Sequence, residues 1–387
     1  MAYDDSKLAA LADFGQSVWL DFISRDLLRS GHLDELVARG VAGMTTNPTI
    51  FQKAIDQGDA YDDDIAVLAA RGRSAAEIAD ALIISDVRAA CDLLRPVYDR
   101  TAHRDGYVSI EVSPEVAYDT RASLREARRL RDAVGRPNVM VKIPGTPPAI
   151  AAIRQAVAAG LHINVTLLFA VDTYQQVIDA FQVGLAERVA RGEPIDDIHS
   201  VASFFVSRID AKADREIDER LAGEADAVVR ERLEGLRGTL ALANARLAYG
   251  RFMESLASER WHRLAERGAR PQRLLWASTS TKDPRYDDLL YVDNLIGRRT
   301  VDTMPQETLE AFLDHGVVRR TLGRDADDEA RGRVEQAAAL GIDLRTITGE
   351  LQSEGVRLFS DSFEGLRDTI ERKRAELPAG EERRLSA

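Results

Sequence analysis

Short apolar runs alternate along the chain with longer segments whose apolar residues recur at helical spacing. Runs of this length, without polar interruption, are typical of strands that are buried on both faces. Eight of them predict strands at residues 17–21, 41–45, 107–112, 139–143, 162–166, 200–205, 274–277 and 300–304. Most connections between the runs are long enough for a helix, as in residues 74–100 and 118–134.

Alternation of strands and helices predicts parallel strands joined by helical crossovers. Eight such units favour an α/β fold of the (β/α)8 TIM-type barrel class, in a single domain over residues 1–387. A doubly wound open sheet is the alternative. In the barrel, the carboxyl ends of all strands lie on one face, where the chemistry of such folds is found.

Two regions exceed the minimum length of a barrel. Residues 211–270, between the sixth and seventh predicted strands, are charged, are rich in Ala, Leu, Arg and Glu, and predict a helical insertion. Residues after position 304 predict extra C-terminal helices, and the polar residues 376–387 are expected to form a frayed tail. No repeat or low-complexity linker divides the sequence, which favours one domain over two.

Composition and charge exclude several classes of function. The net charge of −12 argues against nucleic acid as the main partner, because a phosphate backbone is bound by basic surfaces. No apolar stretch approaches the roughly 20 residues of a membrane-spanning helix, so no membrane partner is expected. The first residues lack the pattern of a signal peptide and the chain has one cysteine, Cys91, which we expect to be a packed side chain in a cytoplasmic protein. The six histidines are scattered, so no metal ion and no cofactor is expected.

The most informative residue is Lys142, which lies within the apolar run at residues 139–143. Burial of a lysine side chain disfavours the ammonium form because the charge loses hydration. A lysine that is partly neutral near pH 7 is a nucleophilic amine, and it can form a Schiff base with a carbonyl substrate. Taken alone, the segment favours a structural lysine that reaches water or pairs with a carboxylate such as Glu111.

The rest of the chain changes this balance, because other polar side chains also lie at or near the ends of the predicted strands. They are Asp21, Thr45, Asn47, Glu111, Asn164, Thr166, Ser203, Arg208, Ser278 and Lys282. In a parallel barrel these ends open on one face, where one lysine, two carboxylates, two amides, several hydroxyls and two cations converge. This set of groups suits amine catalysis with proton transfer, beside a site for phosphate or sugar hydroxyls.

Four segments resemble the motifs of transaldolases, a family of the class I Schiff-base aldolase superfamily. Residues 45–51, Thr-Thr-Asn-Pro-Thr-Ile-Phe, resemble the N-terminal signature, and residues 139–146, Val-Met-Val-Lys-Ile-Pro-Gly-Thr, resemble the Schiff-base lysine motif. Residues 163–169 are similar to the motif of the following strand, and residues 203–208 to the substrate-binding strand. The segments occur in the family's order, and the chain's length and helical insertion are similar to those of the longer bacterial subgroup.

The resemblance implies a transferase that moves a dihydroxyacetone unit reversibly between sugar phosphates in the pentose phosphate pathway. The donor would be sedoheptulose 7-phosphate or fructose 6-phosphate, and the acceptor glyceraldehyde 3-phosphate or erythrose 4-phosphate. Lys142 would form the imine, and Asp21 would take the proton of the C4 hydroxyl. Glu111 and Thr166 would handle the water and protons of imine formation. The chain would act as a monomer or a homodimer, a choice that the sequence leaves open.

The resemblance also implies the residues that contact the substrate. Asn47 and Asn164 would hold the dihydroxyacetone hydroxyls, with Thr45 and Ser203 beside them, and Arg208 would bind the phosphate as a bidentate fork. The chain departs from the commoner short transaldolases after the seventh predicted strand, where a second phosphate-binding arginine is missing. There, Ser278 matches the family's hydroxyl position and Lys282 is the candidate replacement, as a point charge.

Two other functions stay open. The first is a fructose-6-phosphate aldolase-like enzyme that releases free dihydroxyacetone. In that subgroup a tyrosine commonly stands where this chain has Phe205, so Phe205 favours the transferase. The second is a barrel that binds a sugar phosphate without turnover, which would not need a buried amine. Structural roles also stay open for two of the residues, because Asp21 is a suitable helix cap and Asn47 precedes a proline in a possible turn.

Overall fold

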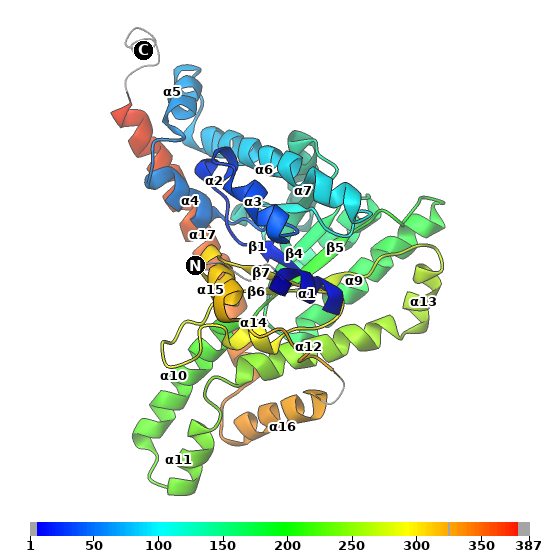
Figure 1. Cartoon of the computed structure of the whole chain (residues 1–387), viewed down its shortest axis with the longest axis vertical. Coiled ribbons are helices and arrows are strands. Elements are labelled where there is room, and N and C mark those ends of the chain that lie inside the picture. Colours follow the sequence, from blue (N-terminus) through cyan, green and yellow to red (C-terminus); the bar gives the residue numbers. More distant parts are fainter. Residues whose placement is uncertain (1–5, 324–325, 378–387) are drawn as a thin grey trace.

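The computed structural model describes residues 6–323 and 326–377. Its seven strands are all parallel and form one sheet in the order β1-β7-β6-β5-β4-β3-β2. They are β1 (Gln16–Leu20), β2 (Val108–Glu111), β3 (Val139–Pro144), β4 (Ile163–Leu168), β5 (Ser200–Phe205), β6 (Arg273–Ala277) and β7 (Thr300–Met304). The predicted α/β fold of TIM type is confirmed, with strands at the centre and helices around them (Figure 1).

The strand predicted at residues 41–45 is wrong. Only Met44 of this segment takes part in bridges, to Leu20 of β1 and to Val108 of β2. The segment still joins the two edges of the sheet, because backbone hydrogen bonds of 2.7–3.0 Å connect it to both. The segment is therefore hydrogen-bonded to both edges without forming a regular strand, and it leads into the helix α4 (Pro48–Asp56), which Asn47 caps.

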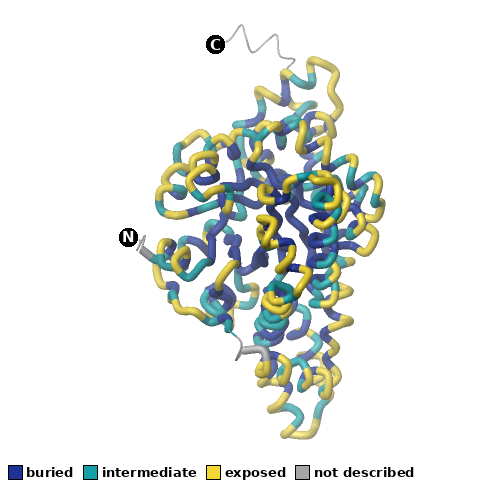
Figure 2. Tube along the Cα trace, turned by 90° about the vertical axis from the view of Figure 1, so that its right-hand side faces the viewer, coloured by how far each residue is buried: buried dark blue, intermediate teal, exposed yellow. Residues whose placement is uncertain are grey.

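Helices surround the sheet and bury its outer face. The longer ones are α6 (Ala75–Arg100), α7 (Thr120–Val134), α8 (Pro147–Ala158), α9 (Val171–Ala190) and α15 (Gln306–His315). Shorter elements are α1 (Ser6–Phe14), α2 (Arg25–Arg29), α3 (His32–Arg39), α5 (Asp62–Ala70), η1 (Pro114–Val116) and α14 (Leu290–Asn294). Every residue of β1, β3, β4, β6 and β7 is buried, as expected for strands with both faces covered. Figure 2 shows these buried strands inside a shell of partly exposed helices.

Four helices separate β5 from β6, and two further helices follow α15. The first group is α10 (Ser207–Gly223), α11 (Ala227–Glu234), α12 (Leu240–Leu256) and α13 (Glu259–Ala265). The second is α16 (Ala326–Ala339) and α17 (Leu344–Glu376). α10 and α11 extend away from the barrel, whereas α17 packs along α4, α6 and α10 (Figure 1). Most of the tail predicted at residues 376–387 lies outside the described residues.

The segment at residues 41–45, which joins the two edges of the sheet, packs tightly at Gly43. This contact offers a test of the fold. A Cβ atom at Gly43 would lie 2.5 Å from the indole ring of Trp19, which is fully buried. We therefore expect Gly43→Ala to lower the free energy of unfolding by about 1–3 kcal/mol, because either the indole ring of Trp19 or the backbone must shift. Gly58→Ala is the matched control, since no atom lies within 4 Å of its added Cβ. Urea unfolding measures both variants, and equal stabilities would contradict the close contact.

Candidate active site

The carboxyl ends of the strands surround a cavity of about 900 Å³. It is lined by eleven of the twelve residues that the sequence indicated as site residues. These are Asp21, Thr45, Asn47, Glu111, Lys142, Thr166, Ser203, Phe205, Arg208, Ser278 and Lys282. The twelfth, Asn164, is fully buried and is not among the residues that line the cavity. The parallel order of the strands thus brings together side chains that are far apart in the sequence, as the barrel prediction required.

Lys142 projects from the buried strand β3 and is 6% exposed. In the sheet it lies opposite Glu111 of β2 on one side and Asn164 of β4 on the other, so these three side chains share one face. Its Nζ lies 3.5 Å from Glu111 Oε2 and donates a hydrogen bond of 3.3 Å to the backbone carbonyl of Thr46. The expected ion pair with Glu111 is therefore present, and it lies inside the cavity.

The carboxyl group of Glu111 is poised to exchange a proton near neutral pH. Burial raises its pKa to about 7, even though the neighbouring Lys142 ammonium acts in the opposite direction. The carboxyl group of Asp21 raises the pKa of Glu111 further, because two negative charges in one cavity repel each other. A carboxyl group of this kind can both donate and accept a proton at pH 7.

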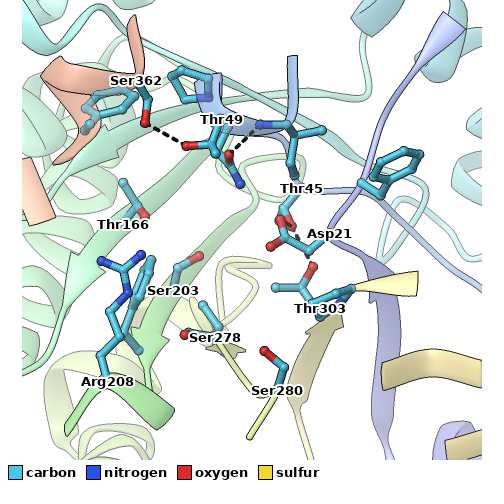
Figure 3. Close-up of a pocket in the computed structure, with 18 of the residues that line it drawn as sticks. Asp21, Thr45, Thr49, Thr166, Ser203, Arg208, Ser278, Ser280, Thr303 and Ser362 are labelled. Carbon is cyan, nitrogen blue, oxygen red and sulfur yellow. Dashed lines mark hydrogen bonds between the residues drawn. The ribbon is translucent and has the colours of Figure 1, made fainter. Parts of the chain in front are cut away.

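Asp21 directly follows β1 and ends a chain of hydroxyl groups (Figure 3). Thr45 Oγ1 donates a 2.7 Å hydrogen bond to Asp21 Oδ1, and Thr303 Oγ1 lies 2.6 Å from Thr45 Oγ1. Because the single hydroxyl proton of Thr45 is directed to Asp21, Thr303 is the donor to Thr45. Burial raises the pKa of Asp21, while Lys142 and the Thr45 hydrogen bond oppose that rise. The alternative role of Asp21 as a helix cap is wrong, since Ser24 caps α2.

Thr166 presents a buried hydroxyl group to the cavity. Its side chain is 1% exposed, and Oγ1 has no hydrogen-bond partner among the described residues. The regular pairing of β4 shifts between Val165 and Leu168, and Leu167 adopts a left-handed backbone with φ of 56°. Irregularities of this kind re-aim side chains next to active sites. An unpaired hydroxyl at a cavity wall is available to a water molecule or to a substrate.

The two amides that the sequence indicated have different positions. Asn164 is fully buried, where Nδ2 donates to Ser109 Oγ at 3.0 Å and Oδ1 accepts from Ser203 Oγ at 2.7 Å. It therefore orients Ser203 through a hydrogen bond inside the barrel. Asn47 lines the cavity, and its Oδ1 caps α4 by accepting a 3.1 Å hydrogen bond from the Ile50 N–H. Its oxygen atom therefore caps a helix, which differs from the turn considered for Asn47 and Pro48.

One side of the cavity is cationic. Arg208, in the first turn of α10, lies with its guanidinium carbon 5.7 Å from the centre of the Phe205 ring. Lys282 donates a 2.6 Å hydrogen bond to Ser280 Oγ. Partial loss of hydration at the cavity lowers the pKa of both cations, and Arg208 lowers the pKa of Lys282 further by repulsion. Two cations that repel each other at a cavity wall favour an anion such as phosphate between them.

The sequence reasoning missed several residues of the cavity. Thr303 lies near the end of β7, so the signal used for the other residues, a polar side chain at a strand end, also applied to it. Phe359 and Ser362 come from α17, and Ser362 Oγ lies 2.7 Å from Thr49 Oγ1 beside the cavity (Figure 3). No local pattern in the sequence indicates that this distant helix reaches the site.

Two further features of the structure concern metal binding and membrane insertion. Among the described residues, no group of three or more His, Cys, Asp and Glu side chains is arranged to hold a metal ion. Within residues 6–323 and 326–377, no helix combines the length and the apolar character needed to cross a membrane.

Comparisons with known proteins agree with this geometry. The family model described as "Transaldolase/Fructose-6-phosphate aldolase" matches residues 18–370. A protein named "Transaldolase" from Parafrankia sp. (strain EAN1pec) is 48% identical over 364 residues, which cover 94% of this chain and 96% of the relative. "Transaldolase" from Thermobifida fusca (strain YX) is 47% identical, with 94% and 97% covered. "Transaldolase 2" from Nostoc sp. (strain PCC 7120 / SAG 25.82 / UTEX 2576) is 45% identical, with 95% and 97% covered. The chain therefore belongs to the transaldolase/fructose-6-phosphate aldolase family.

Proposed function

We propose that this protein is a transaldolase whose Lys142 forms a Schiff base with a ketose phosphate. The observation that carries the proposal is one cavity in which a buried lysine amine pairs with Glu111 and which Asp21 and two cations, Arg208 and Lys282, also line. The dihydroxyacetone unit of sedoheptulose 7-phosphate or fructose 6-phosphate passes to glyceraldehyde 3-phosphate or erythrose 4-phosphate. The relatives named above carry the name of the same activity.

Imine formation begins at the amine of Lys142. Glu111 takes a proton from the ammonium group, and the free nitrogen forms a bond to the C2 carbonyl carbon of the ketose. The resulting carbinolamine loses its hydroxyl group as water, which needs a proton from an acid. Glu111, which now holds a proton and has a pKa of about 7, supplies it. The unpaired hydroxyl of Thr166 orients the water that leaves.

Cleavage then uses Asp21 as the general base. Asp21 accepts the proton of the C4 hydroxyl, the C3–C4 bond breaks, and its electron pair moves into the protonated imine to give an enamine. The aldose phosphate leaves. When an acceptor aldehyde enters, the enamine carbon attacks its carbonyl carbon and Asp21 returns the proton to the new alkoxide. Hydrolysis of the imine regenerates Lys142 and releases the new ketose.

The remaining polar residues orient the substrate in this proposal. Asn47 and Thr45 hold the hydroxyls of the dihydroxyacetone unit. Ser203 is oriented toward the substrate by its hydrogen bond to Asn164. The phosphate lies on the cationic side, where Ser278, Lys282 and Arg208 meet. In this proposal, the enzyme acts in the cytoplasm, within the pentose phosphate pathway, as a monomer or a homodimer.

The competing activity is a fructose-6-phosphate aldolase, which the family description also includes. The aldolase and the transaldolase differ in whether the enamine takes a proton from water or attacks an acceptor sugar. Phe205 lies at the cavity with its ring beside Phe169, at a centroid distance of 5.2 Å. An apolar ring there offers no hydroxyl group to position a protonating water, so Phe205 favours transfer to an acceptor.

The first prediction concerns the nucleophile. We expect borohydride reduction in the presence of fructose 6-phosphate to label Lys142, and we expect Lys142→Ala to abolish the label. Lys142→Arg should also be unlabelled, because a guanidinium stays protonated and cannot form the imine. Peptide mass mapping locates the adduct. A label on Lys53, Lys212 or Lys282 in its place would refute the assignment.

The second prediction follows from the pKa of Glu111. Because this pKa is about 7, the carboxylate that accepts the Lys142 proton becomes populated as the pH rises through 7. The initial rate of labelling should therefore increase with pH and level off above this value. Glu111→Gln should slow labelling by about 10²–10⁴-fold and remove the dependence of the labelling rate on pH. Glu115→Gln, at an exposed position, is the matched control. A pH profile that Glu111→Gln leaves unchanged would refute this role.

The third prediction concerns phosphate recognition. Arg208→Ala should raise KM for fructose 6-phosphate by about 10- to 100-fold, because a charge-assisted contact contributes roughly 1.5–3 kcal/mol. KM for unphosphorylated fructose should change little, and Lys282→Ala should have a smaller effect of the same kind. Arg285→Ala, which removes an exposed arginine paired with Asp283, is the control. Equal losses for both sugars would mean that neither cation binds the phosphate.

A further inference from the structure

A second unusual carboxyl group lies just outside the cavity, at Asp302 of β7. Its side chain is fully buried, and Oδ1 accepts a 3.0 Å hydrogen bond from Thr279 Oγ1. Oδ2 is also buried and has no hydrogen-bond partner among the described residues. The next residue, Thr303, points into the cavity, so the alternation of side chains along a strand directs Asp302 to the helix-facing side. Asp302 therefore cannot touch the substrate.

The residue that Asp302 contacts, Thr279, nevertheless belongs to the loop after β6 that carries Lys282 to the cavity. Thr279 lies between Ser278 and Ser280, which both line the cavity, and it is itself fully buried. Ser278 has a left-handed backbone with φ of 57°, an unfavourable conformation that persists only where the surroundings hold it. The Thr279–Asp302 hydrogen bond can hold Ser278 in this conformation, because it joins the next residue, Thr279, to β7.

The segment that follows this loop, including α14, is hydrogen-bonded to α10. Tyr286 Oη donates to Asp214 Oδ2 at 2.7 Å, and Tyr291 Oη donates to Asp210 Oδ2 at 3.0 Å. α10 also carries Arg208 in its first turn, so this anchor places the end of the loop relative to the other cation. The residues that line the cavity, however, follow β6 directly, where the Thr279–Asp302 bond is the nearer anchor.

We propose that Asp302 is a positioning residue for the phosphate-binding loop at residues 278–282. It fixes this loop at the cavity wall by accepting a hydrogen bond from the Thr279 hydroxyl group. This inference rests on the proposed function. The acceptor atom, Oδ1, is present in the neutral as well as the ionised group. Burial raises the pKa of Asp302 to about 7, and the Thr279 hydrogen bond only partly opposes it, with no charged group of the described residues contributing. An asparagine, which is neutral and keeps the acceptor oxygen, should therefore replace it.

Two pairs of variants test the inference. Thr279→Val removes the donor at nearly constant volume, and Thr279→Ser keeps it. Asp302→Leu removes the acceptor, and Asp302→Asn keeps it. We expect Thr279→Val and Asp302→Leu to raise KM for fructose 6-phosphate about tenfold, with kcat little changed, because the loop loses a hydrogen bond to a buried acceptor. KM for unphosphorylated fructose should stay constant, and the two conservative variants should match the wild type.

The outcomes separate this inference from the proposed function. Borohydride labelling of wild-type Lys142 tests the function, and absence of that label would overturn both. If the wild type is labelled and Thr279→Val keeps its KM for fructose 6-phosphate, Asp302 has no positioning role. The same conclusion follows if KM rises equally for both sugars or if Asp302→Asn behaves like Asp302→Leu. If Asp302→Leu does not fold, as circular dichroism would show, the Thr279 pair decides the question alone.

Discussion

The structure depends on the placement of one ammonium group and two carboxyl groups in a single desolvated cavity. Removing charges from water is costly, and the cost is offset only where opposite charges and hydrogen bonds surround them. Lys142 supplies the positive charge that opposes the effect of burial on both Asp21 and Glu111. Glu111, whose pKa burial and the Asp21 carboxyl group raise to about 7, is therefore the group beside the amine that can both accept and donate a proton at neutral pH.

The barrel provides this arrangement because its parallel strands end on one face. The lateral pairing of β2, β3 and β4 sets Glu111, Lys142 and Asn164 side by side, whereas β1 and the segment at residues 41–45 bring Asp21 and Thr45. The cationic wall is built differently. Its two cations lie on α10 and on the loop after β6, and hydrogen bonds of Asp210 and Asp214 join α10 to the segment that follows this loop. The helical region after β5 thus supports the cationic side of the cavity.

Much of this architecture could be predicted from the sequence, because the relevant signals are local. Seven apolar runs became strands, and the polar residues at their ends line one cavity. The run at residues 41–45 failed as a strand, since pairing is decided by neighbours. Thr303 carried the same signal as Thr45 and was overlooked. The contribution of Ser362 could not be predicted, because the path of α17 across the barrel depends on tertiary packing rather than on periodicity.

In the proposed mechanism Lys142 holds the sugar while Asp21 cleaves it, and the mass of the adduct trapped on the protein tests both roles at once. Borohydride reduction should leave a three-carbon unit on Lys142 of the wild type after incubation with fructose 6-phosphate. The Asp21→Asn variant should instead carry the whole hexose phosphate on the same lysine, because the amide cannot accept the proton of the C4 hydroxyl. A three-carbon adduct in Asp21→Asn, or an adduct on any other residue, would contradict the account.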